Sequence, residues 1–249
     1  MKAVKVMMTK QTSVAALLVL GLVSGGLAVA APALATPKLP PASTVNGITT
    51  QTASANDLFQ GLQKFLNLPA SDRSQVNVFY RLRIKHCDAS QVSLSMNAGG
   101  QTIPMRIAAD GRVTPLPTRE QLNSGASVTI SGPEACSVNP KIVVYSPQPS
   151  GRTYDAAGLT LGVKQGNAAM SKIAGVLALG MAKLDRAYFV GGGSGTVTVG
   201  GQSKPLPRTT ATGEYPAGTP YFVPSDMDGA TSISLSATPS VVLFDTPPK

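Results

Sequence analysis

The sequence predicts an α+β fold of two tandem related units, each a short helix followed by a mainly antiparallel β-sheet. The first observation is a repeat: the segment Gly99–Met105 (GGQTIPM) recurs as Gly200–Leu206 (GGQSKPL), about a hundred residues later. The second is that a run with helical spacing precedes several short strand-like runs in each half of the chain. Together these observations predict an internal duplication.

The N-terminus has the features of a secretory signal peptide. Lys2, Lys5 and Lys10 precede an apolar run over residues 14–31, and Ala33-Leu34-Ala35 supplies a small-residue cleavage site. We expect residues 1–35 to be removed and the protein to reach the periplasm of a Gram-negative bacterium. The alternative is an uncleaved anchor, because about 18 apolar residues can span a bilayer. After cleavage no membrane span is expected, and the loss of three lysines lowers the net charge from +9 to +6.

The first unit is predicted to occupy residues 54–147, after a flexible lead-in over residues 36–53 that is rich in Pro, Thr and Ala. It opens with a short helix that Ser54 or Asn56 caps. The apolar residues of this helix recur at i, i+3 and i+4 spacing, namely Leu58, Phe59, Leu62, Phe65 and Leu66. Pro69 ends the helix, because proline disfavours helical geometry in the residue before it.

A strand follows over residues 76–87, where the side chains alternate between two faces. One face carries Val78, Tyr80, Leu82 and Ile84, and the other carries Phe79, Arg81, Arg83 and Lys85. Further strands are expected over residues 91–98, 101–107, 126–131 and 141–145. The first two of these form a hairpin around Gly99-Gly100, because glycine adopts positive φ at little cost.

The second unit is predicted to occupy residues 153–249, after a Pro- and Gly-rich boundary at residues 147–151. Its helix is expected over residues 167–188. The uncharged stretch of this helix, between Lys172 and Lys183, is ten residues long and too short to cross a bilayer. Strands are expected over residues 196–199, 202–206, 219–223, 230–236 and 240–244.

The chain has two cysteines, Cys87 and Cys136. An exported chain meets an oxidising compartment, so we expect a disulfide between them, at the ends of two strands of the first unit. The alternative is a metal pair or a redox centre. That alternative lacks the close Cys-x-x-Cys spacing and the further ligands it needs.

The first unit also resembles a known family. Its helix is followed by Val78–Arg83 (VFYRLR), Cys87, Ile103-Pro104-Met105, Leu116-Pro117 ahead of Leu122, an Ala-Val-Ile strand and Cys136. This order, over residues 55–145, resembles a family of small exported proteobacterial proteins known only as a domain of unknown function. The family has no assigned catalytic residues, so the resemblance implies export and no particular chemistry. The second unit departs from it, because it lacks both cysteines and the basic strand.

The residue types of common catalytic sites are scarce. His86 is the only histidine, and neighbours on a strand such as His86 and Cys87 point to opposite faces. A catalytic Cys–His pair and a multi-histidine zinc site are therefore not expected, and neither is a cofactor. Asp226–Gly229 has too few acids for a calcium loop and is interpreted as a turn. The other carboxylates cannot be placed opposite one another from sequence, so a carboxylate-dependent hydrolase stays open.

The candidate binding site is the basic face of the first predicted strand, formed by Arg81, Arg83 and Lys85 and extended toward Arg106 and Arg112. Residues 36–152 carry a formal charge of +5 and residues 153–249 of +1. This asymmetry favours an anionic envelope glycan, a phospholipid headgroup or another envelope protein as the partner. From the sequence alone, the preferred interpretation is that these charges protect an exposed sheet edge from aggregation, and ligand binding is the alternative. Nucleic acid is not expected for an exported chain without aromatics among its bases.

These observations favour an exported, non-enzymatic binding or structural protein of the bacterial cell envelope. Two alternatives stay open. One is a carboxylate-dependent envelope hydrolase, and the other is an assembly accessory protein that offers a free strand edge to a partner.

Overall fold

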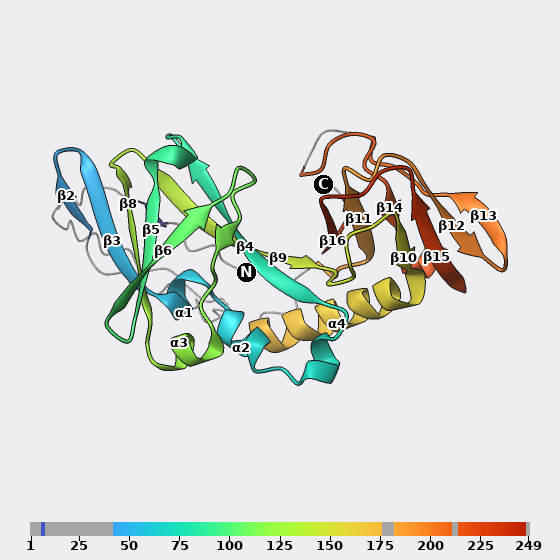
Figure 1. The fold of residues 1–249 in the computed structure, drawn as a ribbon, viewed down its shortest axis with the longest axis horizontal. Helices are drawn as coiled ribbons and strands as arrows, with labels where there is room; N and C mark the ends of the chain where they lie inside the picture. The colour runs from blue at the N-terminus through green and yellow to red at the C-terminus, as the bar shows by residue number, and fades with distance from the viewer. Residues whose placement is uncertain (1–5, 8–41, 176–181, 211–213, 248–249) are drawn as a thin grey trace, which may run out of the picture.

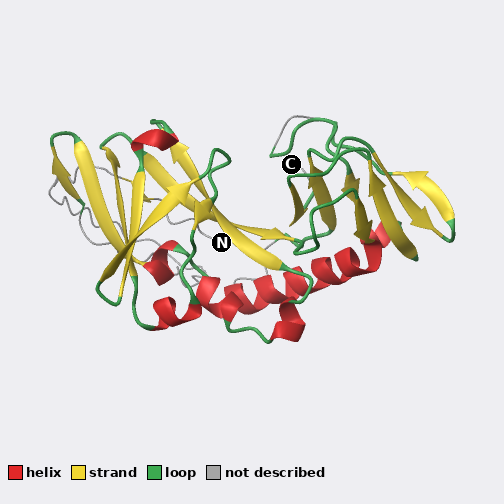
Figure 2. Cartoon of the chain, in the orientation of Figure 1, coloured by secondary structure: helices red, strands yellow, loops and turns green. Residues whose placement is uncertain are grey.

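The computed structural model describes residues 6–7, 42–175, 182–210 and 214–247. It has an α+β fold with antiparallel sheets and few helices, which confirms the predicted fold class. Two lobes lie at either end of a central sheet, and the longest helix runs along one side of the molecule (Figure 1). Strands predominate, and most of the helices gather along that side (Figure 2).

The strands form three sheets. The first lobe has the strand order β2 (Ser43–Val45), β3 (Ile48–Ser54), β8 (Ser127–Pro133), β5 (Ser93–Ala98), β6 (Gln101–Ile107) and β7 (Val113–Thr114). The second lobe has the order β10 (Thr153–Asp155), β15 (Ala230–Leu235), β12 (Gly195–Val199) and β13 (Gln202–Pro205). The central sheet has the order β4 (Asn77–Lys85), β9 (Ser137–Tyr145), β16 (Val241–Asp245), β11 (Arg186–Val190) and β14 (Tyr221–Phe222), and β1 (Val6–Met7) also pairs with β9.

The helices are short except for one. They are α1 (Ala55–Leu58), α2 (Leu62–Leu66), α3 (Arg119–Asn123) and α4 (Ala156–Ala174), with single 3₁₀ turns at Ala70–Arg73, Ala89–Gln91 and Pro224–Asp226. Across the described ranges, no helix combines the length and the apolar character needed to cross a membrane.

The two halves of the chain pair their strands in the same order. In the first lobe β3, β8, β5 and β6 are successive neighbours, and in the second lobe β10, β15, β12 and β13 are. In the central sheet β4 pairs with β9, as β11 pairs with β16. Duplication of one unit would give this arrangement, and the duplication itself stays a prediction.

The recurring Gly-Gly dipeptides form the turns of two equivalent hairpins. Gly99 and Gly100 join β5 to β6 with φ of 60° and 80°, and Gly200 and Gly201 join β12 to β13 with φ of 56° and 78°. Positive φ at both central positions is the geometry of a type I′ turn, whose twist matches the flanking strands. The hairpin predicted for the first copy is confirmed.

The helix predicted for the second unit, over residues 167–188, is placed wrongly. The helix α4 spans Ala156–Ala174, residues 176–181 lie outside the described ranges, and Tyr188 lies in the strand β11. The helix begins at Asp155, whose carboxylate accepts hydrogen bonds from the backbone N–H groups of Ala157 (3.0 Å) and Gly158 (2.9 Å). Its first turns carry several glycines and alanines, which give little apolar periodicity. The N-cap role predicted for Ser54 of α1 is confirmed.

The flexible lead-in predicted over residues 36–53 is wrong for residues 43–53. These residues form β2 and most of β3, and β3 pairs with β8 along its whole length. The buried positions of β3 alternate at Thr49, Gln51 and Ala53. Thr49 and Gln51 are polar. The sequence of β3 therefore lacks the alternation of apolar and polar residues that would have predicted a strand. Residues 36–41, and the predicted leader apart from residues 6–7, lie outside the described ranges.

The helix α4 joins the two halves. The Gln165 side chain accepts a hydrogen bond from the backbone N–H of Gln75 (2.8 Å) and donates one to the carbonyl of Ser71 (2.6 Å). At Gly162 a Cβ atom would lie 2.4 Å from Phe244 Cζ and 2.6 Å from the carbonyl of Gln75. One buried apolar cluster includes residues of both halves, so the two units share a core.

We predict that Gly162→Ala destabilises the protein by about 1–3 kcal/mol, because the added methyl group overpacks the interface between α4 and the central sheet. At an open helical position the same change would stabilise by about 1 kcal/mol, so the sign of the effect is diagnostic. Urea unfolding measures it. Lys164→Ala, at an exposed position of the same helix, should change stability by less than about 0.5 kcal/mol. A stabilising Gly162→Ala would contradict the close packing.

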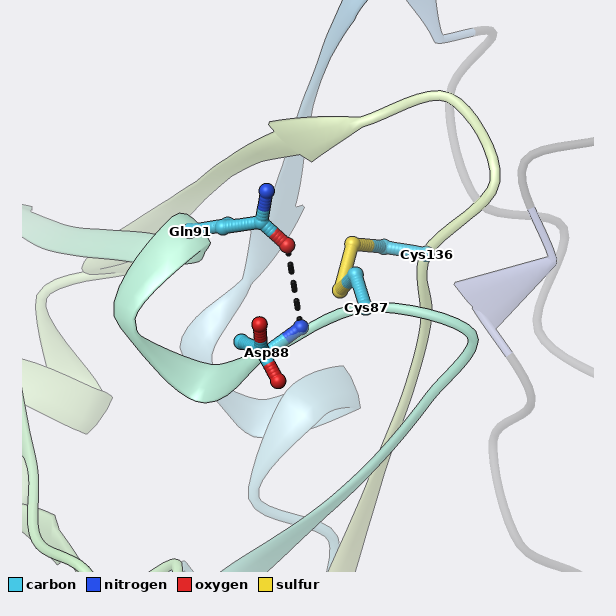
Figure 3. Close-up of a disulfide and its surroundings, with 4 residues drawn as sticks. All are labelled: Cys87, Asp88, Gln91 and Cys136. Atoms are coloured by element: carbon cyan, nitrogen blue, oxygen red, sulfur yellow. Dashed lines mark hydrogen bonds between the residues drawn. A yellow bond between two sulfur atoms is a disulfide. The ribbon is translucent and has the colours of Figure 1, made fainter.

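The disulfide predicted between Cys87 and Cys136 is confirmed. It links the residues just after β4 and just before β9, with 5.3 Å between the two Cα atoms (Figure 3). Next to it, the backbone N–H of Asp88 donates to the side-chain oxygen of Gln91 (3.0 Å). The bond therefore closes one end of the longest strand pair among the described residues, that of β4 with β9.

We predict that the double variant Cys87→Ser/Cys136→Ala is less stable by about 2–4 kcal/mol, because cross-linking residues 49 apart restricts the unfolded chain. Urea unfolding of the variant should match that of the wild-type protein in reducing agent. A loss below about 1 kcal/mol in both cases would show that the disulfide contributes little.

Candidate anion-binding site

The basic residues predicted on the first strand lie on one face of β4. Val78, Tyr80 and Leu82 are buried on the face that packs into the main core, while Arg83 and Lys85 are exposed on the other. This outer face of the central sheet continues across the partner strands. The predicted alternation of β4 is therefore confirmed.

Three cations lie directly opposite one another on the outer face. Arg81 of β4 pairs with Lys141 of β9 on one side and forms an isolated bridge with Arg112 on the other. We call Lys141, Arg81 and Arg112 the cation row. Because neighbouring strands are about 4.8 Å apart, the row spans about 10 Å. Like charges directly opposite each other destabilise a sheet, so this arrangement has a cost in folding.

One carboxylate lies at the Arg112 end of the row. Asp110 Oδ2 lies 3.6 Å from a terminal nitrogen of Arg112 and 4.0 Å from one of Arg81. The guanidinium of Arg112 also lies over the ring of Phe79, 4.1 Å from its centroid. This cation–π contact holds the guanidinium against the sheet face.

A second carboxylate lies at the other end. Glu214 Oε1 forms an ion pair with Lys141 and lies 3.7 Å from a terminal nitrogen of Arg83. Counting Arg83 with the three cations of the row, four positive charges face two carboxylates, which leaves a net charge of +2. The Nε atoms of Arg81 and Arg112 are buried and have no hydrogen-bond partner among the described residues.

Tyrosines line the same face beside the cation row. Asn77, Tyr145, Leu243, Tyr188 and Tyr221 are direct neighbours across all five main strands of the central sheet. We call Tyr145, Tyr188 and Tyr221 the aromatic row. Phe79 links the two rows, because its ring centroid lies 5.5 Å from that of Tyr145. Tyr145 and Tyr221 are half-buried and Tyr188 is buried.

Tyr215, from the connection that leads to β14, covers the middle of the aromatic row. Its ring stacks on Tyr188 with 4.1 Å between centroids and 20° between planes. Its hydroxyl donates to Asp245 Oδ2 at 2.5 Å. Burial, followed by the nearby Asp245 carboxylate, raises the pKa of Tyr215 well above its usual range, and burial raises the pKa of Tyr188 to about 12.

The structure assembles the site only in part from the predicted residues. Arg81, Arg83 and Arg112 lie together, whereas Lys85 lies at the end of β4 and Arg106 lies on β6, where it pairs with Thr114. Lys141, Glu214 and the aromatic row were missed. Lys141 could have been found from the sequence, because alternate residues of a strand share a face. Lys141 therefore lies on the same face as Val143 and Tyr145 of the predicted strand.

Two further carboxylates of the second half and one cysteine of the first half are engaged internally. Both carboxylate oxygens of Asp185 accept from Arg186 at 2.8 Å, and Asp245 accepts from Tyr215 and from the backbone N–H of Thr246. Cys87 is in the disulfide beside His86. Within the described ranges, no group of three or more His, Cys, Asp or Glu side chains could hold a metal ion. The arrangement is suited to holding an anion.

Comparison of the chain with protein-family models, with curated proteins and with solved structures found no match.

We predict that the free energy of unfolding falls between about pH 10 and 12 as a result of the raised tyrosine pKa values. An unfolded tyrosine ionises near pH 10, whereas folded Tyr188 keeps its proton to about pH 12. The stability from the neutral hydroxyls is complete below pH 10 and is lost as the pH rises through the folded pKa.

Urea unfolding from pH 8 to 11.5 measures this decline, and Tyr215→Phe should make it shallower. At pH 8 the same variant should lose about 1–2 kcal/mol with its hydrogen bond to Asp245. An equal pH slope in both proteins would exclude Tyr215 as a contributor.

Proposed function

We propose that the protein is an exported, non-enzymatic binding protein of the bacterial cell envelope, and that it holds an anionic glycan on the outer face of the central sheet. The observation that carries the proposal is the cation row, in which Lys141, Arg81 and Arg112 lie directly opposite one another. Such pairs destabilise a sheet. Asp110 and Glu214 neutralise two of the four positive charges here, and an anionic ligand would neutralise the remaining +2.

Protection of a sheet edge explains the charges less well. The outer edge of β4 is already covered in its middle, where the backbone N–H of Leu82 donates to the carbonyl of Gly111 (2.8 Å) and Arg112 bridges Arg81. Charges that guard an edge need not lie opposite one another on its neighbours. The row extends across the face of the sheet and away from that edge.

The partial exposure of the cation row favours a narrow, extended ligand over the flat surface of a bilayer. The side chains of Arg81 and Arg112 are 24% and 33% exposed, and Phe79 beneath Arg112 is 5% exposed. An extended sugar chain can bring single carboxylates or phosphates to such partly covered groups. Of the adjoining aromatic rings, Tyr145 and Tyr221 are half-buried and leave part of their surface for a sugar ring to pack against. The Cys87–Cys136 disulfide supports location in an oxidising compartment.

We predict that the wild-type protein binds a mannuronic acid hexamer and that Arg81→Gln/Arg112→Gln weakens this binding about tenfold or more, because each lost ion pair to a partly buried arginine removes a charge-assisted hydrogen bond. Isothermal titration calorimetry measures the affinity, which should also fall with rising salt. Lys164→Gln/Lys204→Gln removes the same charge from exposed positions elsewhere and should leave the affinity nearly unchanged.

The unfolding free energy of the arginine variant checks its fold and should change by less than about 1 kcal/mol, because relief of like-charge repulsion offsets the lost cation–π contact and ion pairs. Vesicles containing phosphatidylglycerol and inorganic phosphate serve as the other probes. Binding to vesicles without binding to the hexamer would replace the glycan by a lipid surface. If no probe binds, or if both double variants lose affinity equally, the proposal fails.

A further inference from the structure

The connection that carries Glu214 is much longer than its counterpart in the first half. The pair Ile107↔Val113 closes the first connection around five residues, 108–112, whereas the bridge between Arg208 and Pro220 closes the second around eleven, 209–219. The short connection shows that closing the turn does not require the extra length. In the second half the connection instead reaches the first half, because Glu214 contacts Lys141 and Arg83 there.

Residues 214–220, which we call the 214–220 arm, are held firmly at their base. Thr209 and Thr219 both donate from their hydroxyls to the carbonyl of Pro216 (2.7 Å each), and the backbone N–H of Gly218 donates to the carbonyl of Thr209 (2.7 Å). Tyr215 is fixed by its stacking on Tyr188. These contacts fix the backbone next to Glu214, and its carboxylate lies against Lys141 and Arg83.

The ion pairs of Glu214 are the exposed and weak part of this arrangement. Its side chain is 36% exposed, and those of Lys141 and Arg83 are 32% and 56% exposed. Pairs with this exposure contribute little to stability. A ligand with several anionic groups can therefore displace Glu214 without opening the core.

We propose that Glu214 is a tethered competitor: its carboxylate occupies the Lys141 end of the cation row and must leave before a ligand carboxylate binds there. The inference rests on the proposed function and adds its regulation. A tethered group competes at an effective concentration near the millimolar range, so it weakens every external anion at that position. It also shows that this end of the row accepts a carboxylate.

The test is the affinity of the mannuronic acid hexamer for Glu214→Gln. Removal of the competing charge should tighten binding about threefold to fivefold, as expected for the loss of one exposed ion pair. Glu134→Gln removes the same charge from an exposed position elsewhere and should change the affinity by less than about 1.5-fold. In Glu214→Gln/Lys141→Gln the gain should disappear, because the cation that both carboxylates share is gone.

The outcomes separate this inference from the proposed function. If the wild-type protein binds and the arginine variant does not, but Glu214→Gln matches Glu134→Gln, then Glu214 is only a structural contact. Weaker binding by Glu214→Gln would mean that the carboxylate organises the site, which also overturns the inference. If neither the wild-type protein nor Glu214→Gln binds any probe, both proposals fail together.

Discussion

The pairing of β9 with β16 is the interaction on which the rest of the structure depends. Val144 pairs with Phe244 and Tyr145 pairs with Leu243, and the backbone N–H of Ser146 donates to the carbonyl of Val242 (2.9 Å). If the final strand runs of the two units are aligned, Val144 corresponds to Leu243 and Tyr145 to Phe244. Each residue of one strand then pairs with the equivalent of its partner in the other strand, as in the interface of a two-fold symmetric dimer. This pairing creates one sheet from two halves, and only that sheet can carry a site spanning both.

Local sequence patterns predicted much of the fold. Alternation along residues 78–85 marks β4, because one face of that strand packs into the core and the other meets solvent. The Gly-Gly dipeptides mark the two hairpins, because few other residues adopt positive φ twice in succession. The disulfide was predicted from the lone cysteine pair and the predicted export signal. The strand and the hairpins are decided by residues that are near one another in the sequence, and the disulfide by the presence of only two cysteines.

The proposed binding site depends on contacts that local patterns do not encode. Lys141 joins Arg81 only through the register of β4 against β9, and Glu214 meets Lys141 across 73 residues of sequence. The basic strand was found, but its partners and its carboxylate competitor were not. The lead-in was misjudged for a related reason: β3 buries Thr49 and Gln51, and polar residues give no sign of a core-facing strand. In both cases tertiary pairing overrides what composition suggests.

The most direct test of the account is to map ligand contacts by chemical shift in isotope-labelled protein titrated with the mannuronic acid hexamer. The account predicts that the amide signals that move cluster on β4, β9 and residues 110–112, with a second group at residues 214–215 as Glu214 is displaced. Signals of the lobe sheets, such as β12 and β13, should stay in place. Shifts confined to a lobe sheet, or no shifts at saturating ligand, would contradict the claim that the cation row holds an anion.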